Sequence, residues 1–122
     1  MPEPDLLTSS EVAALEERGV DAILARIRTG ALPAVRLPGG IYRVHRADVA
    51  GRHRPQVRLD GHPEWLRTGQ AAALLRVHAD TVRVWANAGA LPSVLTEGGG
   101  RLRHHRIHRQ TVEQLLNTTG EA

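Results

Sequence analysis

Apolar residues recur at helical spacing at the start of the C-terminal half of the chain, over residues 68–75. The stripe consists of Ala71, Ala72, Leu74 and Leu75. It predicts a short helix. Residues 76–78 follow as a predicted tight turn. A second helix is predicted from about residue 79 to Gly89, because glycine suits the left-handed position just past a helix end.

The two faces of this second helix differ in character. Val82, Trp85 and Ala86 lie three and four residues apart, so they share one face, which we expect to be buried. The outer face carries Asp80, Thr81, Arg83, Val84 and Asn87. A short helix with a polar outer face, placed after a three-residue turn, is typical of a helix that enters the major groove of DNA.

A basic hairpin is predicted after this helix. Pro92 cannot continue a helix, residues 94–96 favour a strand, residues 97–100 form a turn, and residues 101–107 return as a second strand. Four arginines and three histidines fall within residues 101–109. Such a hairpin suits phosphate contacts, although charge also keeps a solvated edge strand from aggregating. The predicted DNA contacts here are Thr81, Arg83, Val84, Asn87, Arg101, Arg103, His104, His105, Arg106 and Arg109.

This stretch follows a recognisable pattern, in which TV-x-x-W-x-x-x-G-x-LP is followed by a glycine turn, an arginine-rich wing and a V-x-x-LL helix. The matching residues are Thr81, Val82, Trp85, Gly89, Leu91, Pro92, Gly98, Gly99, Arg106, Val112, Leu115 and Leu116. The pattern resembles the winged helix-turn-helix modules of MerR-type and excisionase-type proteins, including the BldC-like regulators. Val84 stands where that family often has an arginine, with Arg83 one residue earlier. The resemblance implies double-stranded DNA as the partner, and we expect no small-molecule effector.

The N-terminal half repeats the same pattern at a constant offset of 59 residues. Identical pairs include Leu7/Leu66, Ala13/Ala72, Leu15/Leu74, Asp21/Asp80, Gly30/Gly89, Leu32/Leu91, Pro33/Pro92, Val35/Val94 and Gly39/Gly98. Beyond the glycines the offset becomes 63, so the second wing is longer by four residues. A preserved offset indicates an internal duplication. The predicted fold is mainly α with small β-hairpin wings (α+β), as two tandem winged helix-turn-helix modules over residues 1–50 and 65–122.

The first copy has a different outer face on its second helix, predicted over residues 21–29. Ala22, Leu24 and Ala25 stand where the second copy has Thr81, Arg83 and Val84, and Arg26 takes the position of Trp85. Three interpretations remain open. The helix could read thymine methyl groups, it could contribute only phosphate contacts, or Leu24 could belong to a protein interface. The predicted DNA contacts of this copy are Arg28, Arg36, Arg43 and Arg46.

An arginine-rich linker, residues 51–64, joins the two copies. Its glycines and prolines disfavour helix, and Arg52, Arg54 and Arg58 are its cations. It could be a solvated linker, or a strap along phosphates or in a minor groove that uses Arg54. The fifteen residues from Ala50 to Glu64, when extended, reach about 50 Å, more than one DNA turn of about 34 Å. Two successive major-groove sites would therefore be within reach, for a monomer or for a cooperative assembly.

Charge is unevenly distributed along the 122 residues. All 16 basic residues are arginine, and residues 43–109 hold twelve of them against five acidic residues, a net charge of +7. The segments before and after each carry a net charge of −2. A basic middle between acidic ends indicates a localised surface for a polyanion. An arginine-rich coding bias with a merely solvated surface is the alternative.

Several other functions find no support in the sequence. The absence of cysteine excludes disulfides and thiolate chemistry, and we expect neither a signal peptide nor a membrane span. The chain is thus expected to be cytoplasmic and nucleoid-associated. His104 and His105 would point to opposite faces of a strand, so we expect no metal site there. The sequence contains no nucleophile-elbow or Walker motif, so we expect no catalytic residue and no cofactor. The predicted function is sequence-specific DNA binding as a transcriptional regulator; the alternatives are an excisionase-like DNA-bending factor and a non-catalytic protein adaptor.

Overall fold

The same order of elements occurs twice along the chain: strand, two helices, two strands and a final helix. The computed structural model describes residues 4–97 and 103–118. They fall into two compact units. The first unit comprises residues 4–57 with 115–118, and the second unit comprises residues 58–114. Within the described residues, short helices and two small antiparallel sheets confirm the predicted α+β class.

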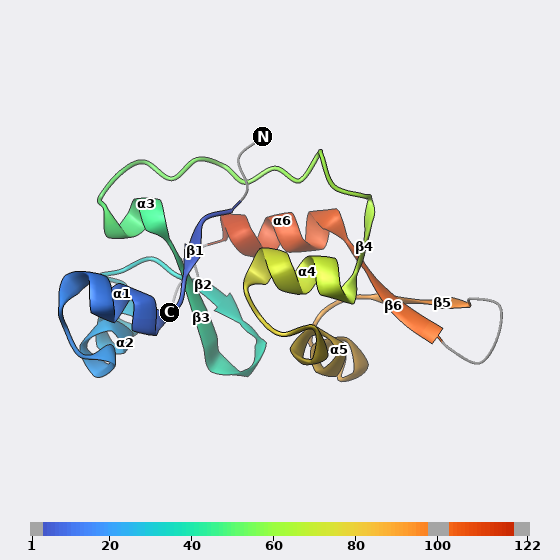
Figure 1. Cartoon of the computed structure of the whole chain (residues 1–122), viewed down its shortest axis with the longest axis horizontal. Helices are drawn as coiled ribbons and strands as arrows, with labels where there is room; N and C mark the ends of the chain where they lie inside the picture. Colours follow the sequence, from blue (N-terminus) through green and yellow to red (C-terminus); the bar gives the residue numbers. More distant parts are fainter. Residues whose placement is uncertain (1–3, 98–102, 119–122) are drawn as a thin grey trace. The chain divides into compact units, whose positions relative to one another are not determined.

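The first unit contains the N-terminal set of elements (Figure 1). They are β1 (Leu6–Leu7), α1 (Ser9–Glu16), α2 (Val20–Thr29), β2 (Val35–Leu37), the 3-10 turn η1 (Pro38–Gly40), β3 (Ile41–His45) and α3 (Arg46–Val49). Their sheet has the order β1-β3-β2, with Leu7 opposite Val44 and Val35 opposite Arg43. Gly39 and Gly40 both have positive φ, which explains why this tight turn uses glycine.

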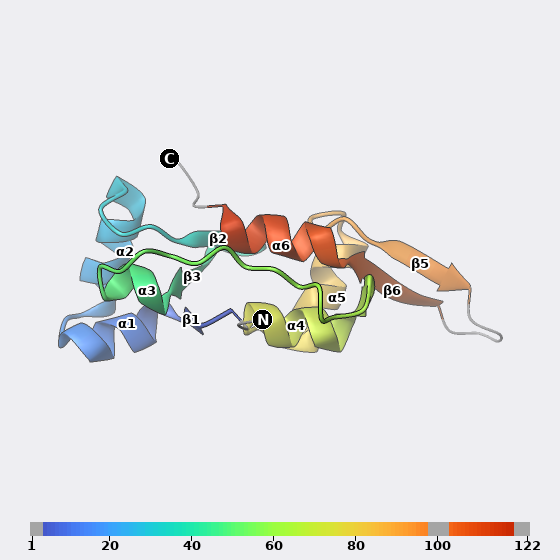
Figure 2. The same ribbon diagram turned by 90° about the horizontal axis from the view of Figure 1, so that it is seen from above.

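The second unit contains the repeated set. Its elements are β4 (Trp65–Arg67), α4 (Thr68–Leu75), α5 (Ala79–Asn87), β5 (Val94–Glu97), β6 (Arg103–His108) and most of α6 (Arg109–Asn117). The predicted helix over residues 68–75 and the turn at 76–78 are confirmed, and Gly89 has the expected left-handed conformation. The hairpin of β5 and β6 projects beyond α5 in both views (Figures 1 and 2). The predicted glycine turn and Arg101 lie outside the described residues.

Each sheet has three strands, whereas the sequence predicted two-stranded hairpins. In the second unit the added strand is β4, which pairs with β6 so that Leu66 lies opposite Ile107. In the first unit β1 has the same role beside β3. The predicted two-stranded hairpin is present as β5 and β6, and the sequence missed only the third strand of each sheet. A strand of two or three residues has too short a pattern to detect, and it exists here because a distant strand supplies its hydrogen bonds.

The buried positions of the two units correspond through the same offsets. The first core contains Leu7, Val12, Ala13, Ile23, Ile27, Leu32 and Val44. The equivalent residues of the second unit are also buried: Leu66, Ala71, Ala72, Val82, Ala86, Leu91 and Ile107. Trp85 is buried as well, which confirms the predicted inner face of its helix. The duplication seen in the sequence is therefore also a repetition of core positions.

The segment predicted as a linker is divided between the two units. Within the first unit, the Val57 N–H donates to Asn117 Oδ1 (2.8 Å), and Asn117 Nδ2 donates to the Val57 carbonyl (3.0 Å). Within the second unit, the Leu59 N–H donates to Glu113 Oε1 (2.5 Å). Val57 and Leu59 are buried, so at these two positions the segment is neither solvated nor available to DNA.

His45 is a buried polar residue of the first unit. Its Nε2 donates a hydrogen bond to the Leu116 carbonyl at 2.7 Å, because a carbonyl can only accept. Burial lowers the pKa of His45, and this bond offsets the effect only in part. The side chain therefore favours the neutral tautomer with the proton on Nε2.

Candidate nucleic-acid interface

A groove in the second unit is formed by the start of α4, the outer face of α5 and strand β6. Its volume is about 830 Å³. The lining residues are Arg67, Thr68, Gly69, Gln70, Arg83, His104, His105 and Arg106. Three of them are arginines and none is acidic, so the groove is a surface suited to an anion.

The start of α4 brings backbone donors to this groove. Arg67 is the residue that caps the helix, and it provides no side-chain hydrogen bond to the first turn. Gln70 Oε1 instead accepts the Arg67 N–H at 2.9 Å. The first-turn N–H groups of a helix lack partners within the helix and carry partial positive charge. At this end they are flanked by the Arg67 guanidinium rather than by an acidic capping side chain.

Helix α5 presents to solvent the outer face predicted for it. Arg83 is about half exposed and forms an ion pair with Asp80 one turn earlier. Val84 has 63% of its surface exposed, and Thr81 is half-buried. A valine exposed to this degree costs hydrophobic free energy unless a partner covers it. Arg83 and Val84 thus lie on a face that offers both a charged donor and an apolar contact.

Strand β6 supplies the other wall of the groove. His104 is exposed, whereas Arg106 is half-buried and donates from Nη1 to the His105 carbonyl (3.1 Å). The His105 ring contacts Asn87 of α5 and Ser93, which precedes β5. The hairpin is therefore connected to α5 through side-chain hydrogen bonds. Arg101 and the side chain of Arg103 lie outside the described part of the chain.

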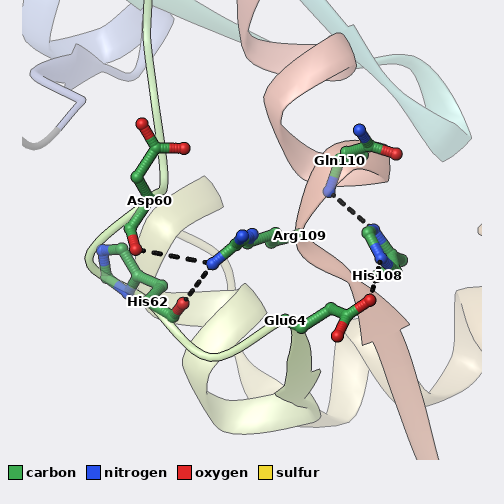
Figure 3. Close-up of polar contacts among 6 residues, drawn as sticks. All are labelled: Asp60, His62, Glu64, His108, Arg109 and Gln110. Atoms are coloured by element: carbon green, nitrogen blue, oxygen red, sulfur yellow. Dashed lines mark hydrogen bonds and ion pairs between the residues drawn. The ribbon is translucent and has the colours of Figure 1, made fainter.

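Arg109 contacts the loop that precedes β4 (Figure 3). Its Nη1 donates to the carbonyl oxygens of His62 (2.9 Å) and Asp60 (3.4 Å), so it holds the loop before β4. Beside it, His108 Nδ1 accepts the Gln110 N–H (3.1 Å) while Nε2 donates to Glu64 (3.2 Å). Arg109 is not among the residues that line the groove.

Most of the DNA contacts predicted in the first copy, and Arg54 of the predicted linker, contact neighbours within the first unit. The Arg36 guanidinium lies 5.5 Å from the centre of the Tyr42 ring, and Arg43 donates to the Tyr42 carbonyl. Arg46 pairs with Asp5, in an ion pair that is largely exposed. Arg54 pairs with Asp48 in a largely buried contact. Arg28 is exposed on α2.

Leu24, the candidate contact with a protein partner, exposes less apolar surface than we expected from its predicted place on the outer face of the helix. Leu24 is half-buried, and the larger exposed apolar side chains of the first unit are Leu15 and Val20. Leu24 thus offers less free apolar surface than Val84 does in the second unit.

Four of the lining residues had not been predicted: Arg67, Thr68, Gly69 and Gln70. The signal was present in the duplication, because Arg67 occupies the position of Thr8. Thr8 caps α1 by accepting the Glu11 N–H, and Glu11 Oε1 accepts the Thr8 N–H in return. At this position the first copy has a helix-capping threonine, whereas the second copy has a cationic side chain.

Metal sites and membrane-spanning helices are absent from the described part of the chain. Residues 4–97 and 103–118 contain no group of three or more histidines or acids placed to hold a metal ion. No helix in these ranges combines the length and apolar character that spanning a membrane demands.

Comparison with known proteins identifies one domain. Searches of curated proteins and of solved structures gave no match. The family model of the helix-turn-helix domain matches residues 65–120, which include the groove and the whole pattern β4-α4-α5-β5-β6-α6. Residues 65–120 are therefore similar to helix-turn-helix domains, which supports DNA as a partner.

Proposed function

We propose that this protein is a non-catalytic, sequence-specific double-stranded DNA-binding protein that acts as a transcriptional regulator. The observation that carries the proposal is the groove of the second unit. It joins three arginines and the free N-terminal end of α4 to the exposed face of a helix in a matched helix-turn-helix domain.

In this proposal each wall of the groove has a separate role. Arg67 and Arg106, together with the first-turn amides of α4, contact phosphates and set the register of the protein on the duplex. Arg83, Thr81 and Val84 face the base edges in the major groove, where arginine pairs with guanine and valine contacts a thymine methyl group. The ion pair of Arg83 with Asp80 is exposed and weak, so Arg83 can exchange it for a base.

We further propose that the chain consists of two winged helix-turn-helix modules. The repeated element order, the two sheets of matching topology and the equivalent core positions support this. Base reading is assigned to the second module, because its α5 exposes Arg83 where the first has half-buried Leu24. The first module contributes phosphate contacts, for which exposed Arg28 and largely exposed Arg46 remain accessible.

The test begins with selection of binding sites from a random duplex library, followed by titration of the selected and random duplexes at several salt concentrations. We expect a defined consensus and a log–log salt dependence that loses about 0.9 in slope for each phosphate-contacting arginine replaced. Equal affinity for selected and random DNA would overturn sequence-specific binding. A phasing assay on the same duplex separates simple occupancy from the pronounced bending expected of an excisionase-like factor.

A further inference from the structure

We infer that His105 is a positioning residue that fixes the amide of Asn87 as a hydrogen-bond donor, so that Asn87 selects a guanine edge in the DNA site. This inference rests on the proposed function of the same groove. It assigns recognition of a guanine edge to Asn87, with His105 holding the Asn87 amide in place.

The geometry around His105 involves both of its ring nitrogens. Nε2 lies 2.7 Å from Asn87 Oδ1, and Nδ1 lies 2.9 Å from Ser93 Oγ. Asn87 is the last residue of α5, Ser93 directly precedes β5, and His105 lies in β6. One imidazole therefore joins the end of the recognition helix to both sides of the hairpin.

The chemistry of the groups determines where the protons lie. An amide oxygen only accepts, so Nε2 carries the proton and donates to Asn87 Oδ1. A neutral imidazole has one N–H, hence Nδ1 accepts, and the Ser93 hydroxyl donates to it. The three side chains form one directed chain from Ser93 through His105 to Asn87.

This chain determines what Asn87 can offer to DNA. Its oxygen is turned toward His105, while its Nδ2 group retains two donors on an exposed side chain. An asparagine normally reads adenine by donating to N7 and accepting from N6, which requires both of its polar atoms to face the base. With Oδ1 held by the hairpin, the remaining donors fit the two acceptors of guanine, O6 and N7.

The experiment starts from binding-site selection with the full wild-type chain and with Asn87→Ala. The base pair at which their preferences differ locates the Asn87 contact, and we expect the wild type to prefer guanine there by about tenfold over adenine. Replacing that guanine by 7-deazaguanine, which lacks the N7 acceptor, should reduce wild-type affinity and leave Asn87→Ala unaffected.

Two isosteric replacements of His105 then test its positioning role. The amide nitrogen of His105→Gln reaches the position of Nε2 and can still donate to Asn87, so guanine preference should be retained. His105→Asn reaches only the position of Nδ1, so the Asn87 amide is released and adenine should be accepted within about twofold to threefold of guanine. Circular dichroism and melting temperature should be the same for both variants, because the surrounding core is unchanged.

His104→Ala serves as the matched control. It removes an imidazole from the same groove wall without touching the chain of hydrogen bonds. It should lower affinity for all sequences alike and keep the guanine preference. Should His105→Asn not fold, Ser93→Ala replaces it, since loss of the hydroxyl removes the donor that fixes the His105 tautomer.

Three results would overturn the inference. One is an Asn87→Ala chain with unchanged preference, which would mean that Asn87 touches only phosphate or no DNA. Another is a His105→Asn chain that retains the guanine preference, which would reduce His105 to a structural brace. The third is a wild-type preference for adenine at the located pair. In contrast, a wild-type chain that selects no sequence contradicts the proposed function itself.

Discussion

The two units differ most clearly at one pair of equivalent positions. In the second unit Leu75 and Trp85 are both buried. In the first unit the same positions, 59 residues earlier, hold Glu16 and Arg26, whose side chains form a partly exposed ion pair at 2.6 Å. An apolar pair in one copy is therefore matched by a charged pair in the other.

The residues at these two positions therefore stabilise the two units on different energetic grounds. Burial of a leucine and a tryptophan stabilises a small core by several kcal/mol. An exposed or partly exposed ion pair contributes only about 0–1 kcal/mol. We infer that the stability of the second unit depends on its inner helix face more strongly than that of the first.

The first turns of α1 and α4 also differ, and here the first unit has the stabilising interaction that the second unit lacks. Thr8 closes the first turn of α1 with a capping box, whereas Arg67 leaves the first turn of α4 without a side-chain cap. Thr8 is followed at Glu11 by a carboxylate that would repel a phosphate, and Arg67 is followed at Gln70 by a neutral amide. Local stability is favoured at one helix start, and anion binding at the other.

The largest expected effect is on stability, at Trp85. Trp85→Ala should destabilise the protein by about 3–5 kcal/mol, because a buried aromatic side chain is replaced by a cavity. Arg26→Ala, the matched change in the first copy, should cost about 1 kcal/mol or less. Urea unfolding followed by circular dichroism measures both, and similar losses would show that the two positions are equivalent in energy as well as in place.

The next largest effect is on DNA binding, at Arg83. Arg83→Ala should weaken binding to the selected duplex by about 1–3 kcal/mol and relax the preference at one base pair. Arg28→Ala, which removes an exposed arginine from the first copy's second helix, should weaken binding to selected and random duplexes alike. An equal loss on both duplexes for Arg83→Ala would assign Arg83 to phosphate.

Exchanging the helix caps should separate stability from binding. Arg67→Thr should stabilise α4 by about 0.5–1 kcal/mol by supplying a side-chain acceptor, and it should lower DNA affinity by removing a phosphate contact. Thr8→Ala should destabilise α1 by about 1 kcal/mol with little effect on the salt dependence of binding. Should Arg67→Thr bind DNA with unchanged affinity, the helix start of α4 lies outside the interface.

The smallest expected effect concerns pH and His45. Because burial lowers its pKa in the folded protein, the unfolded chain takes up a proton first as the pH falls below about 6.5. Stability from this group is thus present above that pH and is lost as the pH falls toward the lowered pKa. Its surroundings include Arg54, Asp48 and Asp5, which also act on it.

His45→Gln keeps a donor for the Leu116 carbonyl but does not titrate. Urea unfolding at a series of pH values should show a shallower loss of stability for this variant than for the wild type. Equal pH dependence of the two proteins would mean that other groups account for the acid sensitivity.

The helices were predictable because their information is local. Periodic apolar residues and the glycine at position 89 placed α4 and α5 correctly. Strands β1 and β4 were missed, since their existence depends on pairing with β3 and β6 far along the chain. Of the residues that line the groove, Arg83 and those of β6 were predicted from the sequence. Arg67 was not predicted, because its position beside them depends on the packing of α4 against the hairpin.

Charge alone did not reveal which arginines are engaged within the protein. Arg54 and Arg109 were predicted as DNA contacts from their basic surroundings. In the structure Arg54 pairs with Asp48, and Arg109 donates to two backbone carbonyls. Such contacts depend on the folded path of a loop, which no local pattern of charge encodes.

The central claim is that the groove of the second unit is the DNA interface. The most direct test is the salt-dependent affinity of the triple variant Arg67→Ala, Arg83→Ala and Arg106→Ala for the selected duplex. Its control is the triple variant Arg18→Ala, Arg52→Ala and Arg58→Ala, which removes the same charge from exposed arginines that do not line the groove.

We predict that the groove variant loses the preference for the selected duplex and that its log–log salt slope falls by about 2, near 0.9 for each of the phosphate-contacting residues Arg67 and Arg106. The control variant should keep the preference and most of the slope. Retention of selective binding by the groove variant, with its loss in the control, would contradict the assignment of the interface.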